Sequence, residues 1–310
     1  MESIKRVFYP KAFQPIPPGM LNAEAMNREP TTYWKNVWRT FKKNKEAMAS
    51  LIIIGILVFL IIFGPMMNQY DYISNDYAAS NLGPNSDHWF GTDNLGRDLW
   101  TRLWVGGRVS LLIAILSTIF PYIIGITVGG ICGFFGGKVD MIIMRLIDIL
   151  MGVPSLIYMI LLMMVFGSGN VLTLVIAMSV TSWMGAARST RGLVLSLRQR
   201  EYIVASETLG GNAPRIISRH LIPNSMGILI VGMTMSVPGC IFSEAYLSYI
   251  GLGVTPPQPS WGQLITAAGE TFRNYPYQFA IPCLITGLTI LCFNLIGDGL
   301  RDAMDPKLHV

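Results

Sequence analysis

The chain has 310 residues, of which 52% are hydrophobic and only 13% are charged, and its net charge is +5. Soluble globular domains average about 25% charged residues, so this chain carries roughly half the usual share. The charged residues are missing in blocks, and each block is close to the ~20 apolar residues that cross a bilayer as a helix. This pattern argues against a soluble enzyme, a disordered scaffold and a nucleic-acid-binding protein.

The N-terminal 46 residues divide into a proline-rich tail and a basic helix. Residues 1–30 hold five prolines and no apolar periodicity, which indicates an irregular tail without a secretory signal. Beyond it, apolar residues recur at helical spacing among lysines and arginines, at Trp34, Val37, Trp38 and Phe41. The spacing predicts a basic amphipathic helix on the inner membrane surface, with simple positive flanking of the first span as the alternative.

Six apolar blocks follow, each long enough, or nearly so, to span a bilayer as a helix. They are Ala47–Met67, Arg108–Phe135, Met141–Phe166, Val171–Ala187, Ser225–Tyr249 and Tyr277–Ile296. Backbone polar groups in lipid must find partners within the segment, which a helix provides. We therefore expect an all-α polytopic membrane protein with six transmembrane helices.

The basic residues set an orientation, because short cytosolic loops carry an excess of Lys and Arg. With the N-terminus in the cytosol, 19 of the 23 basic residues fall in cytosolic segments. The outer segments then keep only Arg97, Arg102, Arg108 and Arg273. Both termini are therefore expected in the cytosol, and the positive net charge reflects this orientation rather than a substrate.

The expected organisation follows from these spans. It comprises a cytoplasmic tail with the amphipathic helix (1–46), a first span (47–67), an extracytoplasmic loop (68–107), a transmembrane domain (108–300) and a cytoplasmic C-terminus (301–310). The outer loop and the Gly- and Pro-rich segment 251–276 are large and polar, which suits the docking of a soluble protein.

The second span carries small residues at every fourth position: Gly125, Gly129, Gly133 and Gly137. Small residues at this spacing let another helix approach closely. The stripe therefore predicts a helix–helix contact, either within the chain or with a partner chain. A Gly-Lys pair lies at its end, but no Ser or Thr follows the lysine, so the phosphate-loop motif is incomplete.

Few ionisable residues lie inside the spans. Arg145 lies one turn before Asp148 near the cytosolic interface, so we expect these two to form a structural ion pair. Glu244 lies about nineteen residues past Ser225, roughly 28 Å along the helix and near the outer surface. It is a candidate for lining the pathway at an outer gate, with simple hydration as the alternative. The cysteines and histidines show no metal-ligand spacing, so no metal site is expected.

Residues 188–224, between the fourth and fifth spans, form a long basic segment with helical periodicity. A first helix from Glu201 is expected to end at Gly210-Gly211, and Asn212 to cap a second helix that stops before Pro223. The first helix would present Tyr202, Ala205, Ser206 and Leu209 on one face. Such a helix could insert into a groove on another protein, and a surface-lying helix pair without a partner is the alternative.

This segment resembles a known family. Ala205-Ser206-x-x-x-Gly210, followed after nine residues by His220-Leu221-Ile222-Pro223-Asn224, resembles the E-A-A-x-x-x-G…I-x-L-P loop of ATP-binding-cassette importer permeases. Val204 stands where Glu is usual, Ser206 replaces Ala and His220 replaces Ile. In that family the loop docks into the ATPase subunit, which implies coupling roles for Glu201, Tyr202, Ala205, Ser206, Leu209, Gly210, His220 and Pro223.

Further runs are similar to the C-type permease of oligopeptide and dipeptide importers. They include Gly91-Thr92-Asp93-Asn94-Leu95-Gly96-Arg97-Asp98, Tyr249-Ile250-Gly251-Leu252-Gly253-Val254 and Gly297-Asp298-Gly299-Leu300-Arg301-Asp302. The resemblance extends from about Thr31 to Lys307. It implies the type-1 importer permease fold for residues 108–300, and a multi-pass subunit in a bacterial inner membrane.

The resemblance also implies partners: a homologous second permease, two ATPases, an external peptide-binding protein, the peptide substrate and membrane lipid, with no nucleic acid. ATP and Mg²⁺ would lie on the ATPases, so this chain is expected to bind no cofactor and to catalyse no reaction itself. A dipeptide, nickel or glutathione permease is the alternative within the family. A secondary transporter is a weaker alternative, because no internal repeat with interrupted helices is visible.

Overall fold

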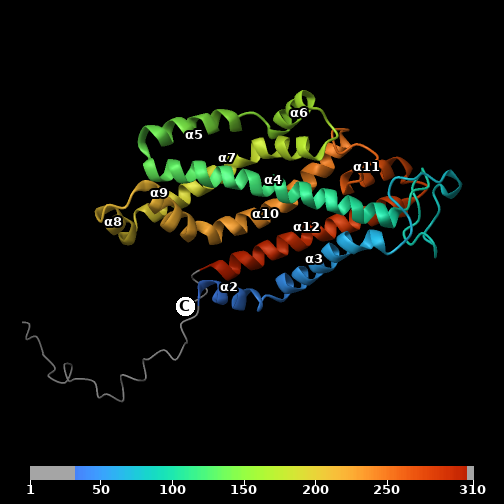
Figure 1. The fold of residues 1–310 in the computed structure, drawn as a ribbon, viewed down its shortest axis with the longest axis horizontal. Helices are drawn as coiled ribbons and strands as arrows, with labels where there is room; N and C mark the ends of the chain where they lie inside the picture. Colours follow the sequence, from blue (N-terminus) through green and yellow to red (C-terminus); the bar gives the residue numbers. More distant parts are fainter. Residues whose placement is uncertain (1–31, 306–310) are drawn as a thin grey trace, which may run out of the picture.

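The computed structural model describes residues 32–305, and within that range its regular elements are all helices. Five are long and apolar enough to cross a membrane. They are α3 (Lys45–Phe63), α4 (Leu99–Phe135), α7 (Val171–Arg198), α10 (Ile222–Tyr249) and α12 (Pro276–Met304). Figure 1 shows them running along the long axis of the molecule. The all-α polytopic architecture predicted from the sequence is confirmed, while the tail of residues 1–30 and Lys307 lie outside the described residues.

The third predicted span is broken. In place of one helix over 141–166, α5 (Gly137–Met151) and α6 (Ser155–Phe166) are bent by 83° relative to each other. Pro154 explains the break, because proline has no N–H to donate and disfavours helical geometry at the residue before it. The expected six spans are therefore reached only if this bent pair is one crossing.

Several of the other helices extend beyond the apolar blocks. α4 begins at Leu99 rather than Arg108, because the carboxylate of Asp98 caps it by accepting from the N–H of Thr101 at 2.8 Å. α7 continues through polar sequence to Arg198. Hydropathy detects only the apolar part of such helices, so it does not predict the polar turns at their ends.

The glycine stripe of α4 lies against α7. A Cβ added to Gly125 would lie 2.5 Å from the Cβ of Ala186, and one added to Gly133 would lie 2.8 Å from the Cβ of Val194. Gly129, between them, meets the same helix. Only glycine permits this spacing, and the contact is made within the chain.

Gly137 does not share this contact. The backbone leaves the helix at Gly136, so α4 ends at Phe135, two residues before the stripe would be complete, and Gly137 begins α5. A Cβ on Gly137 would meet nothing within 4 Å, and its φ of +55° lies in the left-handed region that favours glycine. Its role is to turn the chain between two helices, not to pack them.

The basic helix predicted near the N-terminus is α2 (Tyr33–Phe41). Val37 and Phe41 are buried against Ala303 and Met304 at the end of α12. Trp34 and Trp38 lie on its exposed side. One apolar face therefore anchors α2 to the helical bundle, which leaves the tryptophans free to meet a membrane surface.

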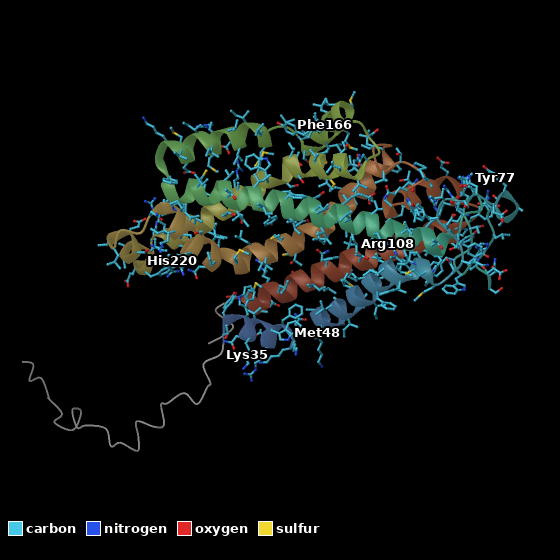
Figure 2. The ribbon with its side chains drawn as sticks, in the orientation of Figure 1. Lys35, Met48, Tyr77, Arg108, Phe166 and His220 are labelled. Atoms are coloured by element: carbon cyan, nitrogen blue, oxygen red, sulfur yellow. The ribbon has the colours of Figure 1, made fainter. Side chains whose placement is uncertain are left out.

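The two ends of the molecule differ. At one end lie α2, α8 (Glu201–Thr208) and α9 (Ala213–Ile216), and Lys35 and His220 mark this end in Figure 2. At the other end lie residues 68–98, marked by Tyr77, together with α11 (Trp261–Thr271). The 251–276 segment was expected only as a polar loop, and α11 within it starts where Ser260 caps its first turn.

Candidate functional site

α8 is held to the bundle by one buried side chain. Ile203 is fully buried and belongs to a cluster with Phe134, Val194, Ile216 and Leu221. Most of the remaining α8 side chains are exposed, and Leu209 just after the helix is 88% exposed. The helix therefore presents a broad free face at its end of the molecule.

The turn after α8 has the geometry expected from its glycines. Gly210 has φ +82°, and the N–H of Gly211 donates to the carbonyl of Ser206 at 2.9 Å. Asn212 caps α9, since its side-chain oxygen accepts from the N–H of Arg215 at 3.2 Å. These bonds fix the direction in which α8 leaves the bundle.

The helix after Asn212 does not stop before Pro223, as the sequence had suggested. α9 passes through a π-helical turn, Ile217–Leu221, directly into α10, where Pro223 occupies the first turn. The π-helical turn changes the hydrogen-bond pattern just before Pro223, so the missing N–H of the proline does not end the helix. Ile216 and Leu221 are fully buried rather than presented outward.

Asn224 connects α8 to α10. Its side-chain amide donates to the hydroxyl of Tyr202 at 3.2 Å and to the carbonyl of His220 at 2.7 Å. A displacement of α8 would therefore reach the start of α10 through a polar link as well as through the Ile203 cluster. Sequence reasoning missed this link because the two side chains lie in different helices.

Ion pairs join α5 to α7 near the same end. Asp148 pairs with Arg188 of α7, not with Arg145 as the sequence had suggested, and Asp140 pairs with Arg191. α5 lies against α7, so each carboxylate meets an arginine of the facing helix rather than one of its own. Both pairs are partly exposed, so each contributes little to stability, about 0–1 kcal/mol, but they fix how α5 lies on α7.

A cavity of about 470 Å³ lies between α4, α6, α7 and α10. Among the described residues that line it, none carries a charge. Hydroxyl side chains are prominent in the lining, together with methionine and proline; they include Ser117, Thr118, Thr181, Ser182, Ser236 and Ser243. The volume falls within the range of roughly 300–1,000 Å³ that small-molecule sites occupy. The sequence signal was hydroxyl residues recurring inside apolar spans, which hydropathy alone does not separate from packing.

Glu244 lies apart from this cavity. It is fully buried and is not among the described residues that line the hollow. Its carboxyl oxygens accept hydrogen bonds from Ser110 at 3.0 Å, Ser248 at 3.0 Å and Ser260 at 2.7 Å. The hydrated alternative is therefore wrong for this structure, because the side chain is buried and joins α4, α10 and α11. Its role at an outer gate stays a prediction.

The folded loop at the opposite end is held by buried polar bonds. The Nδ1 of His88 lies 2.9 Å from the carboxylate of Asp98, which caps α4. Gln278 of α12 donates to the carbonyl of Thr92 at 2.9 Å. These bonds tie the loop to two membrane-spanning helices. Among residues 32–305, no group of three or more His, Cys, Asp or Glu is placed to hold a metal ion.

Comparison with known families decides what this architecture is. A family model described as "Binding-protein-dependent transport system inner membrane component" matches residues 125–310, more than half of the chain. The chain belongs to this family of transport permeases. A second model, for the N-terminal transmembrane domain of oligopeptide transport permease C, matches residues 32–84. The permease is thus an inner-membrane component of an ATP-binding-cassette importer.

Curated relatives span nearly the whole permease. An oligopeptide transport system permease protein of Bacillus subtilis is 44% identical over 297 residues, which cover 96% of this chain and 97% of the relative. A dipeptide transport system permease protein of the same species is 42% identical, covering 93% of this chain and 90% of the relative. A glutathione transport system permease protein of Pectobacterium atrosepticum is 37% identical, covering 89% and 92%.

The coupling residues suggested by the sequence lie together in this permease. Glu201, Tyr202, Ala205 and Ser206 are on α8, Leu209 and Gly210 follow it directly, and His220 and Pro223 begin the return into α10. Figure 2 places His220 at the end opposite Tyr77. The group therefore lies at one end of the permease, in the segment that connects the cavity-lining helices α7 and α10.

Proposed function

We propose that this permease carries oligopeptides, received from an external binding protein, through a path that it forms with a homologous second permease. Two cytosolic ATPases drive transport by moving α8. The observation that carries the proposal is the geometry of α8, which is exposed on one face, anchored by Ile203 and linked through Asn224 to α10. α10 in turn lines the cavity.

The charge distribution supports an inward position for α8. Basic residues lie on or beside the elements at the end that holds α2 and α8: Lys35 on α2, Arg200 before α8, Arg215 on α9 and Arg219 in the π-helical turn. Lys and Arg favour the cytosolic side of short loops. Both termini and α8 are therefore proposed to face the cytosol, and the loop 68–98 to face the binding protein.

The permease itself is proposed to be non-catalytic and to bind no cofactor. The chain lacks a complete phosphate-binding loop, since valine follows the only Gly-Gly-Lys run. ATP and Mg²⁺ would be held by the ATPase partners. Membrane lipid would surround the apolar outer face of the helices and meet the tryptophans of α2.

The experiment is uptake by the reconstituted complex of both permeases, the ATPases and the binding protein. Ala205→Glu places a carboxylate on the exposed face of α8 and should lower ATP-driven peptide uptake about tenfold, because coupling energies of 1–3 kcal/mol correspond to roughly 5–150-fold. Ser196→Glu, an exposed position on α7 at the same end, is the matched control and should transport normally.

The outcomes separate the parts of the proposal. Normal peptide uptake by Ala205→Glu would contradict the coupling role of α8. Uptake of labelled dipeptides, glutathione or nickel in place of a tetrapeptide would keep the permease function and change the substrate. Uptake driven by an ion gradient without ATPases would favour a secondary transporter.

A further inference from the structure

Most hydroxyl groups that line the cavity are already committed as donors to their own helix, while Ser117 on α4 donates to the sulfur of Met178 on α7 at 3.8 Å. Thr181 and Ser182 donate to the carbonyl of Met178 at 3.1 and 2.9 Å. Ser236 donates to Gly232 and Ser243 to Gly239, each at 2.8 Å. Each hydroxyl has one proton, and in these residues that proton points back into the helix that carries it.

A hydroxyl whose proton is already engaged in a hydrogen bond can interact with other partners only through its acceptor lone pairs. Thr118 on α4 has the same arrangement, donating to the carbonyl of Ala114 at 2.8 Å. The phenol of Tyr122, also in the lining, lies 3.4 Å from the oxygen of Ser236 and donates to it, because the proton of Ser236 is committed to Gly232. The oxygens of three helices, α4, α7 and α10, thus border one hollow as hydrogen-bond acceptors. A lining rich in uncharged hydrogen-bond acceptors is suited to a ligand that carries N–H donors.

We propose that this cavity recognises the main-chain N–H groups and N-terminal ammonium of a passing peptide, so that the permease reads the backbone and not the side chains. This inference rests on the proposed function. The lining residues support it further, because no described lining residue carries a charge that would select acidic or basic side chains. Met159 and Met178 supply flexible apolar surface that adapts to side chains of different shape.

Peptide N-methylation tests the proposal, because it removes one N–H donor and leaves the carbonyls and side chains in place. The complex is reconstituted in proteoliposomes, and uptake of tetra-alanine is compared with that of its singly N-methylated forms. Each uptake rate is measured with the binding protein saturated, after its affinity for each peptide has been determined separately. Wild-type uptake should fall about three- to tenfold on N-methylation, the effect of losing one hydrogen bond.

Variants of α10 test whether the fall in uptake on N-methylation arises in the cavity. In Ser236→Ala and in Ser243→Ala, and most of all in the double variant, the difference between methylated and unmethylated peptides should shrink. Thr234→Ala is the matched control: Thr234 is on the same helix, donates to Ile230 at 3.0 Å in the same way and is not a described lining residue. It should keep the wild-type difference.

Each outcome bears on the proposal. Equal wild-type uptake of methylated and unmethylated peptides, or an unchanged difference in both single variants, would overturn it. ATPase stimulation by the loaded binding protein shows that each variant is folded and assembled. If wild-type complex moves no peptide in either form, the proposed function itself fails, which is a distinct result.

Discussion

Glu244 shows how a single buried residue organises three elements. Its carboxyl group gathers hydroxyl donors from α4, from its own helix α10 and from Ser260, which also caps α11. The N–H of Trp261 donates in turn to Ser110 at 3.0 Å. A buried acceptor with this many donors is costly to remove, because each hydroxyl would lose its partner away from water.

The first stability prediction concerns this residue. Glu244→Ala should lower the free energy of unfolding by about 2–4 kcal/mol, since it leaves buried hydroxyls unpaired and opens a cavity. Glu244→Gln keeps the volume and one acceptor oxygen and should cost less. Thermal unfolding of the purified protein in detergent should rank wild type above Gln and Gln above Ala. A ranking with Ala equal to wild type would show that the hydroxyl group contacts contribute nothing.

The role of Glu244 could not be predicted from the sequence. A lone carboxylate in an apolar segment is by default a functional candidate. Its partners are separated from it by 4, 16 and 134 residues, so only the fold brings them together. The predicted Arg145–Asp148 pair was wrong for the same reason, because the actual partner of Asp148 is Arg188, forty residues away on a facing helix.

At the scale of elements, the contact between α4 and α7 depends on the absence of side chains. Gly129→Ala should destabilise the protein by about 1–3 kcal/mol, because the added methyl group has no room against α7. Gly192→Ala, on α7 with nothing within 4 Å of its Cβ position, is the matched control. It should be neutral or stabilising by up to about 1 kcal/mol, the helix propensity difference between Gly and Ala. Denaturation midpoints of the two variants measure this contrast, and equal midpoints would contradict the packing role.

The helices were predictable to different degrees. Apolar block length located the membrane-spanning helices, and glycine spacing indicated the α4–α7 contact without showing which helix was the partner. The sequence predicts one helix through Pro154 and a helix end before Pro223. In the structure the helix breaks before Pro154 and continues through Pro223. The difference is the local backbone: a π-helical turn directly precedes Pro223 and accommodates the missing N–H within a continuing helix, whereas no such turn precedes Pro154.

At the scale of the whole molecule, the two ends carry different chemistry, and this asymmetry predicts an orientation. In intact cells, a membrane-impermeant maleimide should label Ser86→Cys in the exposed loop but not Ser196→Cys on α7. Labelling of Ser196→Cys should appear only after the membrane is permeabilised. The four native cysteines lie in transmembrane helices, and substituting them first removes any background. The reverse labelling pattern would place both termini outside.

The continuous helix from α9 into α10 gives the protein a lever. α9, the π-helical turn and α10 follow one another without a break from Ala213 to Tyr249, 37 residues. At 1.5 Å per residue this is roughly 55 Å, so a tilt of about 5° about the midpoint would move each end by roughly 2 Å in opposite directions. The arm that begins at Ala213 is attached to α8 through Asn224, and the arm that ends at Tyr249 is attached to α11 through Glu244. If this helical run moves as one body, a push delivered at the α8 end would appear at the α11 end with its sign reversed.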